Sequence, residues 1–115
     1  MNLMDAFYIP IAALTAPVWA GKKRSGWAER FGKTAALPPV RSGAVGRLLI
    51  HAVSVGEVSA LRPLVPLLSD FDVVISSTTD TGLARATQLF SPSCHVVRYP
   101  LDFSWAVERF LNAVK

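Results

Sequence analysis

Polar and ionisable residues follow the first apolar run of the chain closely enough to form a reactive site. Leu48 to Val53 suits a short strand buried on both faces, and Ser54, Gly56 and Glu57 come directly after it. Ligands of open α/β sheets bind at the carboxyl ends of strands. Glu57 would lie in the first turn of the next helix, where the helix dipole favours its ionised form. This pattern is typical of a general base that accepts a proton from a hydroxyl, with Gly56 allowing a sharp turn and close approach of a ligand.

The same spacing also has a purely structural explanation. Ser54 followed three residues later by Glu57 is the pattern of a capping box, in which the two side chains bond backbone N–H groups at the start of a helix. Such a cap stabilises a helix by about 1 kcal/mol. The spacing alone favours capping over catalysis.

A second polar run, Ser76 to Gly82, closes the next apolar segment. The hydroxyls of Thr79 and Thr81 and the backbone N–H groups near Gly82 would begin a helix, and such groups bind sugars or phosphates. The explanation that we prefer is that Thr79 or Asp80 simply caps that helix. Neither polar run contains a G-x-G-x-x-G or a G-x-x-x-x-G-K-[ST] sequence, so neither indicates a dinucleotide or a P-loop phosphate.

Strand-like and helix-like runs alternate after residue 46. This alternation predicts right-handed βαβ units, a parallel sheet and helices on both of its faces, which together make a partial Rossmann-like α/β domain over residues 47–115. Pro63 and Pro66 should kink the first helix or make it restart at Pro63. Asp102 should cap the last helix. The expected strands are 48–53, 73–77 and 95–99, and the expected helices are 57–68, 82–90 and 103–114, the last with a buried stripe of Phe103, Ala106, Val107, Phe110, Leu111 and Val114.

The start of the chain is apolar. Residues 3–20 carry one charge, Asp5, and basic residues follow, an order that predicts a retained membrane-anchor helix within residues 1–21 and a cytoplasmic remainder. The segment is short for a membrane span and contains Pro10 and Pro17, so a tilted, kinked or interfacial helix is an open alternative. A buried helix of a soluble domain is another.

Length, charge and cysteine content narrow the class of protein. The 115 residues allow one domain, and much of the positive charge behind the net +4 lies between positions 21 and 50, from Lys22 to Arg47. We interpret residues 22–46 as a basic juxtamembrane segment and linker. A basic segment after an apolar one indicates membrane lipids and argues against a nucleic-acid partner. Cys94 is the only cysteine beside two histidines, so we expect no disulfide, no metal site and no cofactor.

Four short motifs, taken in order, resemble the opening of the Kdo transferase family, which transfers 3-deoxy-D-manno-octulosonic acid (Kdo). Their order and spacing are hard to obtain by chance, and together they cover nearly the whole chain. The motifs are Gly26-Trp27-Ala28-Glu29-Arg30-Phe31-Gly32, similar to W-x-E-R-[FY]-G; His51-Ala52-Val53-Ser54-Val55-Gly56-Glu57, similar to H-x-x-S-V-G-E; Thr78-Thr79-Asp80-Thr81-Gly82, similar to T-T-x-T-G; and Pro100-Leu101-Asp102 ahead of Val107-Glu108-Arg109-Phe110-Leu111.

The resemblance implies a glycosyltransferase of lipopolysaccharide biosynthesis with a GT-B fold, in which the active site lies between two Rossmann-like domains. The N-terminal domain binds a lipid A precursor at the cytoplasmic face of the inner membrane, and the C-terminal domain binds the donor CMP-Kdo. Glu57 matches the family's general base. The basic residues after the anchor would then face lipid head groups and the acceptor's phosphates. The expected substrate-binding residues are Ser54, Gly56, Thr79, Thr81 and Gly82.

The chain also departs from the family. It has no counterpart of the family's E-T-E-L-W-P region, which holds another catalytic carboxylate, and none of the donor domain. We therefore interpret the chain as a truncated product, or as a half that needs a second polypeptide, and we expect it to be inactive alone. The alternative hypothesis is a non-catalytic, membrane-anchored α/β module that binds lipid or a partner.

Overall fold

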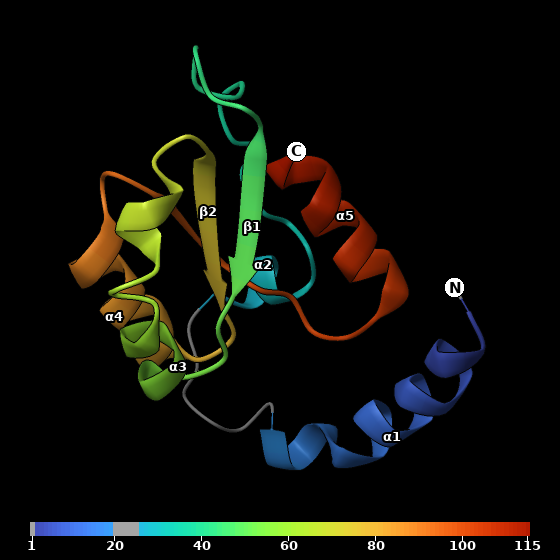
Figure 1. The fold of residues 1–115 in the computed structure, drawn as a ribbon. Helices are drawn as coiled ribbons and strands as arrows, with labels where there is room; N and C mark the ends of the chain where they lie inside the picture. The colour runs from blue at the N-terminus through green and yellow to red at the C-terminus, as the bar shows by residue number, and fades with distance from the viewer. Residues whose placement is uncertain (1, 20–25) are drawn as a thin grey trace.

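The computed structural model describes residues 2–19 and 26–115. Helices and strands alternate along most of the described chain, as the sequence predicts (Figure 1). The elements are α1 (Leu3–Trp19), α2 (Trp27–Arg30), β1 (Arg47–His51), α3 (Val55–Ala60), a 3₁₀ helix η1 (Val65–Leu68), β2 (Asp72–Ser77), α4 (Asp80–Phe90), β3 (His95–Arg98) and α5 (Ser104–Val114).

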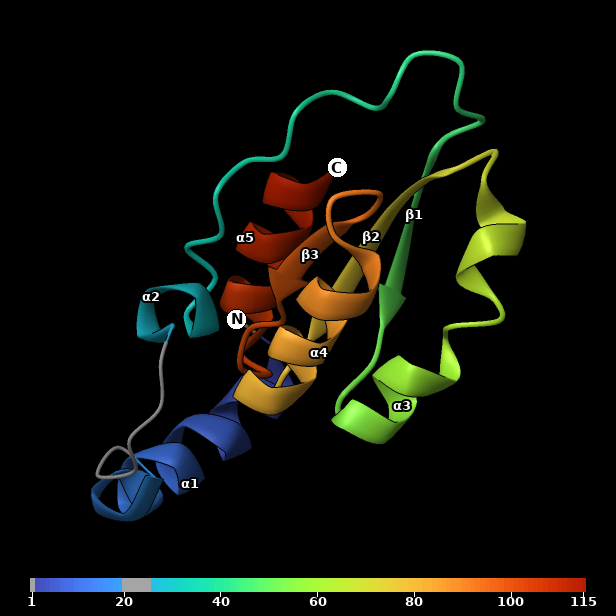
Figure 2. The ribbon, with the colours of Figure 1, turned by 90° about the vertical axis from the view of Figure 1, so that its left-hand side faces the viewer.

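The three strands form one parallel sheet in the order β1-β2-β3 (Figure 2). Arg47 pairs with Asp72 at the start of β1, and His51 pairs with Ser76 at its end. The central strand β2 is buried along its whole length, which explains the unbroken apolar run Val73–Ile75 at its centre. The predicted strands are confirmed. β1 ends two residues earlier than expected because the peptide of Val53 turns out of the sheet to bond neighbouring loops.

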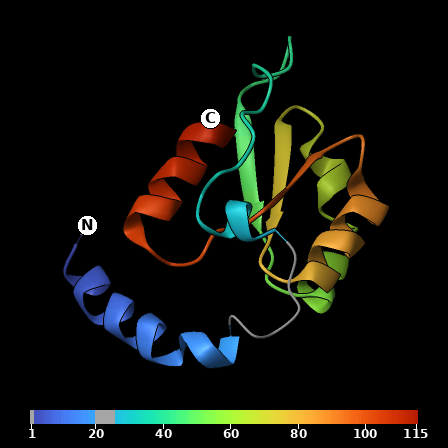
Figure 3. The same ribbon diagram turned by 180° about the vertical axis from the view of Figure 1, so that it is seen from behind.

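Helices cover both faces of the sheet, which confirms the predicted α/β layers. α3, η1 and α4 pack on one face, and α5 packs on the other (Figure 3). On α5, Ala106, Phe110 and Val114 are buried at intervals of four residues. Leu111 is 43% exposed, so its predicted place in the buried stripe is wrong. The buried residues of α5 recur every four residues, so they cover a narrower face of the helix than the predicted i, i+3, i+4, i+7 pattern.

The prolines interrupt the first crossover helix, as predicted. α3 ends at Ala60, a turn carries Pro63, and the chain becomes helical again as η1, where Pro66 lies in the first turn. The new helical turn therefore begins at Val65 rather than at Pro63. Proline removes a backbone donor and clashes with the preceding turn of a helix. Two short helical segments are therefore more stable here than one kinked helix.

α1 is a 17-residue helix with Pro10 and Pro17 inside it. No helix in the described ranges is both long enough and apolar enough to cross a membrane. Large apolar side chains are exposed along this helix, namely those of Leu3, Met4, Phe7, Ile11 and Leu14.

Asp5 fastens α1 to the start of α5. Its carboxylate is only 1% exposed and accepts hydrogen bonds from the backbone N–H of Ser104, at 2.9 Å, and from the Ser104 hydroxyl. These bonds hold the pKa of Asp5 below its ordinary value. The predicted cap, Asp102, is wrong: the N-cap position is Phe103, without a side-chain cap, and Asp102 is exposed. A carboxylate from a distant helix therefore meets the positive end of α5.

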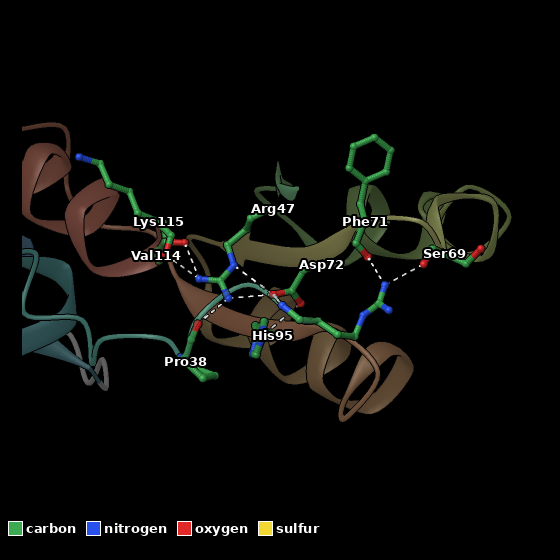
Figure 4. Close-up of polar contacts among 9 residues, drawn as sticks. Pro38, Arg47, Ser69, Phe71, Asp72, His95, Val114 and Lys115 are labelled. Carbon is green, nitrogen blue, oxygen red and sulfur yellow. Dashed lines mark hydrogen bonds and ion pairs between the residues drawn. The ribbon is translucent and has the colours of Figure 1, made fainter. Parts of the chain in front are cut away.

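Three basic residues predicted to face lipid or phosphate instead hold the fold together. Arg30 is 3% exposed and forms an ion pair with Asp80. Arg47 forms an ion pair with Asp72, and the guanidinium of Arg41 donates to backbone carbonyls (Figure 4). The predicted basic segment also contains the short helix α2, whereas residues 33–46 form no helix or strand. Lys22, Lys23 and Arg24 lie outside the described residues.

Candidate functional site

The peptide of Val53 connects the loop after β1 to the loop after β2. Its N–H donates to Oε2 of Glu57 at 2.5 Å. Its carbonyl accepts hydrogen bonds from Ser77 Oγ at 3.2 Å and from Thr79 Oγ1 at 3.0 Å. Val53 is 24 residues from Ser77 and 26 from Thr79, so two polar runs that are distant in the sequence are held side by side at the carboxyl edge of the sheet. This is the edge where ligands of open α/β sheets bind.

Glu57 projects from the first turn of α3 and is exposed. The Val53 N–H orients one carboxylate oxygen, and no described residue forms a hydrogen bond with the other oxygen, Oε1. The carboxylate thus has a fixed direction and one oxygen open to a ligand. This geometry suits a group that accepts a proton from a bound hydroxyl.

The predicted capping box is not formed. Ser54 occupies the N-cap position of α3, but its side chain makes no capping hydrogen bond. Glu57 does reach back, yet it bonds the N–H of Val53, one residue before the cap. The Ser54 hydroxyl is therefore not committed to the helix end and lies exposed beside Glu57.

Gly56 does not make the predicted sharp turn. It lies within α3 and does not have the positive φ that would require glycine. A Cβ placed there would meet no atom within 4 Å, so the absence of a side chain leaves open space next to Glu57. That space, rather than a special backbone conformation, distinguishes this position.

The start of α4 confirms the structural interpretation of Thr79. Thr79 is the N-cap, and its hydroxyl accepts the N–H of Gly82 at 3.0 Å. Gly82 is buried, and a Cβ on it would lie 2.7 Å from Thr79 Oγ1 and closer still to Ser77 Oγ. Glycine at this position therefore allows the two hydroxyls to reach Val53. Thr81, by contrast, is exposed in the first turn of α4.

An arginine pair adjoins the start of α4 and was missed by sequence reasoning. Arg30 donates to the Thr78 carbonyl at 3.1 Å and to Asp80 Oδ1 at 3.0 Å, and Arg98 forms an ion pair with the same carboxylate oxygen. Both arginines are at least 95% buried, whereas Asp80 is 41% exposed at its side chain. The motif of α2 thus contacts the Thr78–Gly82 motif directly. The sequence contains both motifs, Gly26–Gly32 and Thr78–Gly82, but nothing in it indicated that the two are in contact.

A cavity of about 590 Å³ lies elsewhere in the molecule, between η1, α4 and the starts of β2 and β3. Its lining is mostly apolar and contains none of Ser54, Glu57, Thr79 or Thr81. Ser54, Glu57 and Thr81 are exposed at the carboxyl edge, so their chemistry depends on what binds against it.

Comparison with known proteins agrees with the motifs. The family model for 3-deoxy-D-manno-octulosonic-acid transferase (kdotransferase) matches residues 25–115, which includes every element except α1. No solved structure matches the chain.

Curated relatives named 3-deoxy-D-manno-octulosonic acid transferase are similar over most of the chain. The protein of Haemophilus influenzae is 35% identical over 94 residues, which cover 76% of this chain and 21% of that protein. The protein of Bordetella pertussis is 34% identical over 107 residues, with 82% and 24% covered. The protein of Chlamydia muridarum is 33% identical over 124 residues, with 98% and 28% covered. The chain therefore spans about a quarter of the length of these relatives.

Proposed function

This chain belongs to the 3-deoxy-D-manno-octulosonic-acid transferase family, and from that premise we propose that it forms the acceptor-binding part of an enzyme that transfers Kdo from CMP-Kdo to a lipid A precursor. The curated relatives from Haemophilus influenzae and Bordetella pertussis carry the transferase name, and the chain corresponds to a quarter or less of their length. The donor CMP-Kdo would bind to a part of the enzyme outside these residues. The reaction would need no metal or cofactor from this chain.

Glu57 is the general base in this proposal. It takes the proton from an acceptor hydroxyl, whose oxygen forms a bond to the anomeric carbon of Kdo while the bond from that carbon to the CMP phosphate breaks. The observation that carries the proposal is the geometry of this carboxylate. It is exposed at the carboxyl edge of the sheet, oriented by the Val53 N–H, and open at Oε1.

The other candidate residues divide into two roles. Ser54, Gly56 and Thr81 are exposed beside Glu57 or at the start of α4, where they can contact an acceptor sugar. Thr79 and Gly82 do not contact the substrate in this proposal but contribute to its binding through the loops. Their atoms are engaged in joining the two loops, so they position the loops that carry the exposed residues.

We further assign α1 to the lipid surface at the cytoplasmic face of the inner membrane. Leu3, Phe7, Ile11 and Leu14 recur at intervals of four, four and three residues, so they share one side of the helix, and all four are exposed. Exposed apolar side chains in such number mark a surface that binds a membrane or another protein, and we assign this one to the lipid surface. The bond from Asp5 to α5 would then hold the α/β layers next to the membrane that contains the acceptor.

The decisive substitution is Glu57→Gln, with Glu108→Gln on the exposed face of α5 as the matched control. We expect Glu57→Gln to lower Kdo transfer to a lipid A precursor by at least about 100-fold, because general-base catalysis contributes about that much or more. The assay uses the whole chain together with the donor-binding half of a curated relative. Equal transfer rates for Glu57→Gln and Glu108→Gln would rule out the base assignment.

The same two proteins separate the enzyme from the non-catalytic lipid-binding module. Sedimentation with vesicles of inner-membrane lipids should be the same for both, because Glu57 lies in α3 and the exposed apolar residues lie in α1. If neither protein supported transfer while both bound vesicles, the module hypothesis would replace the enzyme hypothesis.

A further inference from the structure

His51 is an ordered, exposed imidazole at the carboxyl edge of the sheet. It is the last residue of β1 and pairs in register with Ser76 of β2. Its Nδ1 lies 2.9 Å from Ser76 Oγ. Its ring centroid lies 4.2 Å from that of Tyr99, which follows β3, with the planes tilted by 38°. The ends of all three strands thus contribute to holding one side chain that remains exposed to solvent.

The surroundings of Ser76 determine which ring nitrogen carries the proton. Ser76 is fully buried, and in the described part of the chain His51 is the one hydrogen-bond partner of its hydroxyl. A buried hydroxyl proton without an acceptor is more costly than an oxygen lone pair without a donor. The Ser76 hydroxyl therefore donates to Nδ1, and the proton of neutral His51 is on Nε2.

The exposed nitrogen of His51 is consequently a donor. None of the described residues accepts a hydrogen bond from Nε2. Val53 follows His51 by two residues, so the backbones of the two residues lie within about 7 Å of each other. Val53 is the residue whose N–H orients Glu57. A bound sugar is large enough to contact the side chains of His51 and Glu57 at once.

We infer that His51 binds the acceptor directly by donating its Nε2–H to an oxygen of the acceptor sugar or of its phosphate. This role rests on the acceptor-binding function proposed above and is separate from that of Glu57, because a protonated Nε2 cannot take the proton of the attacking hydroxyl. Ser76 and Tyr99 are positioning residues for the ring.

Nuclear magnetic resonance of the imidazole rings in the full 115-residue chain tests this inference. The chain has only two histidines, and His95 serves as an internal control because it lies beside Asp72 at the opposite end of the sheet. Long-range ¹H–¹⁵N correlation distinguishes the two tautomers, and deacylated lipid A is the probe. We expect the Nε2–H tautomer for His51 in the free chain, and a change in the His51 but not the His95 ring signals on titration.

Two substitutions separate contact from packing. In His51→Gln the amide nitrogen takes the place of Nε2, whereas in His51→Asn it takes the place of Nδ1. We expect His51→Asn to weaken binding of the probe by about tenfold or more and His51→Gln to retain most of the affinity, because one hydrogen bond to a ligand is worth about that factor. If His51→Asn and the unchanged chain bound a dephosphorylated probe equally well, the oxygen that accepts the Nε2–H would belong to the phosphate. If His51→Asn still bound that probe more weakly, the oxygen would belong to a sugar hydroxyl.

The outcomes distinguish this inference from the function on which it rests. An Nδ1–H tautomer in the free chain would overturn the inference, whatever the probe does. So would a probe that perturbs the backbone amides of Gly56 and Glu57 but binds His51→Asn as tightly as the unchanged chain, and in that case the acceptor-binding function would stand. A probe that perturbs neither those amides nor His51 would overturn both.

Discussion

At one end of the sheet, Arg47, Asp72 and His95 begin the three strands and lie next to one another. At the other end, the chain leaves β1 through His51 and the loop that carries Glu57. Arg47 is 7% exposed and Asp72 is 9% exposed at the side chain, and His95 Nε2 is 3.3 Å from Asp72 Oδ1. His51 and Glu57 are both exposed. All strands of a parallel sheet run in one direction, so their amino ends lie together at one edge of the sheet and their carboxyl ends at the other.

The amino end is closed because its polar groups are satisfied by the chain itself. The Arg47 guanidinium donates to Asp72, to the Pro38 carbonyl at 2.6 Å and to the carbonyls of Val114 and Lys115 (Figure 4). It thereby ties the linker and the end of α5 to β1 and β2. The carboxyl end keeps one oxygen of Glu57 and one nitrogen of His51 available. The comparison teaches that the groups left available to a ligand lie at the carboxyl end, whereas Arg47 and Asp72 at the amino end are committed to the fold. Substitutions of Arg47 or Asp72 should therefore change stability without removing a ligand contact.

The largest effect on stability is expected at the closed end. Arg47→Met would leave the buried Asp72 carboxylate without its main partner and should lower the free energy of unfolding by about 3–5 kcal/mol. Urea unfolding measures this change. Arg62→Met, at an exposed arginine near η1, is the matched control and should change stability by less than about 0.5 kcal/mol. A loss below 1 kcal/mol for Arg47→Met would show that the network does not hold the two layers together.

A pair of glycine substitutions sharpens the comparison within the open end. Gly82→Ala should lower the free energy of unfolding by about 1–3 kcal/mol, because the new methyl group would meet Ser77 Oγ and Thr79 Oγ1. Gly56→Ala should leave stability unchanged or raise it by up to about 1 kcal/mol, since its Cβ has open space within a helix.

Ligand binding should reverse that order. The methyl group of Gly56→Ala would occupy the open space beside Glu57, so we expect it to weaken binding of deacylated lipid A more than Gly82→Ala does among folded molecules. Calorimetric titration of both variants checks this. If Gly56→Ala bound the probe as well as the unchanged chain, the space beside Glu57 would not be part of the binding surface.

Local patterns in the sequence predicted the elements of the fold well. Strand positions follow from short apolar runs, and the break near Pro63 follows from the missing backbone donor, because both signals are contained within a few residues. The same holds for the cap at Thr79, whose partner is three residues away. Glu57 was found as a candidate for a related reason, since it follows a strand directly.

Contacts between distant segments could not be predicted in this way. Asp5 bonds Ser104 across 99 residues, so the sequence pattern pointed to the nearer Asp102 as the cap of α5. Arg30 and Arg47 were grouped with a basic segment because their neighbours in the sequence are basic. Their partners, Asp80 and Asp72, are 50 and 25 residues away. A run of charges shows where charge is concentrated but not which residues are paired after folding.

The smallest effect is expected from acid, and it should arise at the closed end. Burial raises the pKa of Asp72, but hydrogen bonds from the Arg47 side chain and the Arg41 N–H, and the charges of His95 and Arg47, outweigh it and hold that pKa below the ordinary value of 3.8. A carboxyl group with a lowered pKa in the folded state contributes stability that is fully present above pH 3.8 and is lost as the pH falls through the folded-state value.

Thermal unfolding measured from pH 7 to pH 2 tests this assignment. Asp72→Asn should be less stable than the unchanged chain at pH 7, and it should lose less stability between pH 4 and pH 2 because the titrating group is gone. Asp70→Asn, at the exposed residue in the turn before β2, should keep the full acid dependence. If Asp72→Asn and the unchanged chain had parallel profiles, the acid sensitivity would come from other carboxyl groups. Asp5 would be the first to examine, because Ser104 lowers its pKa in the same direction.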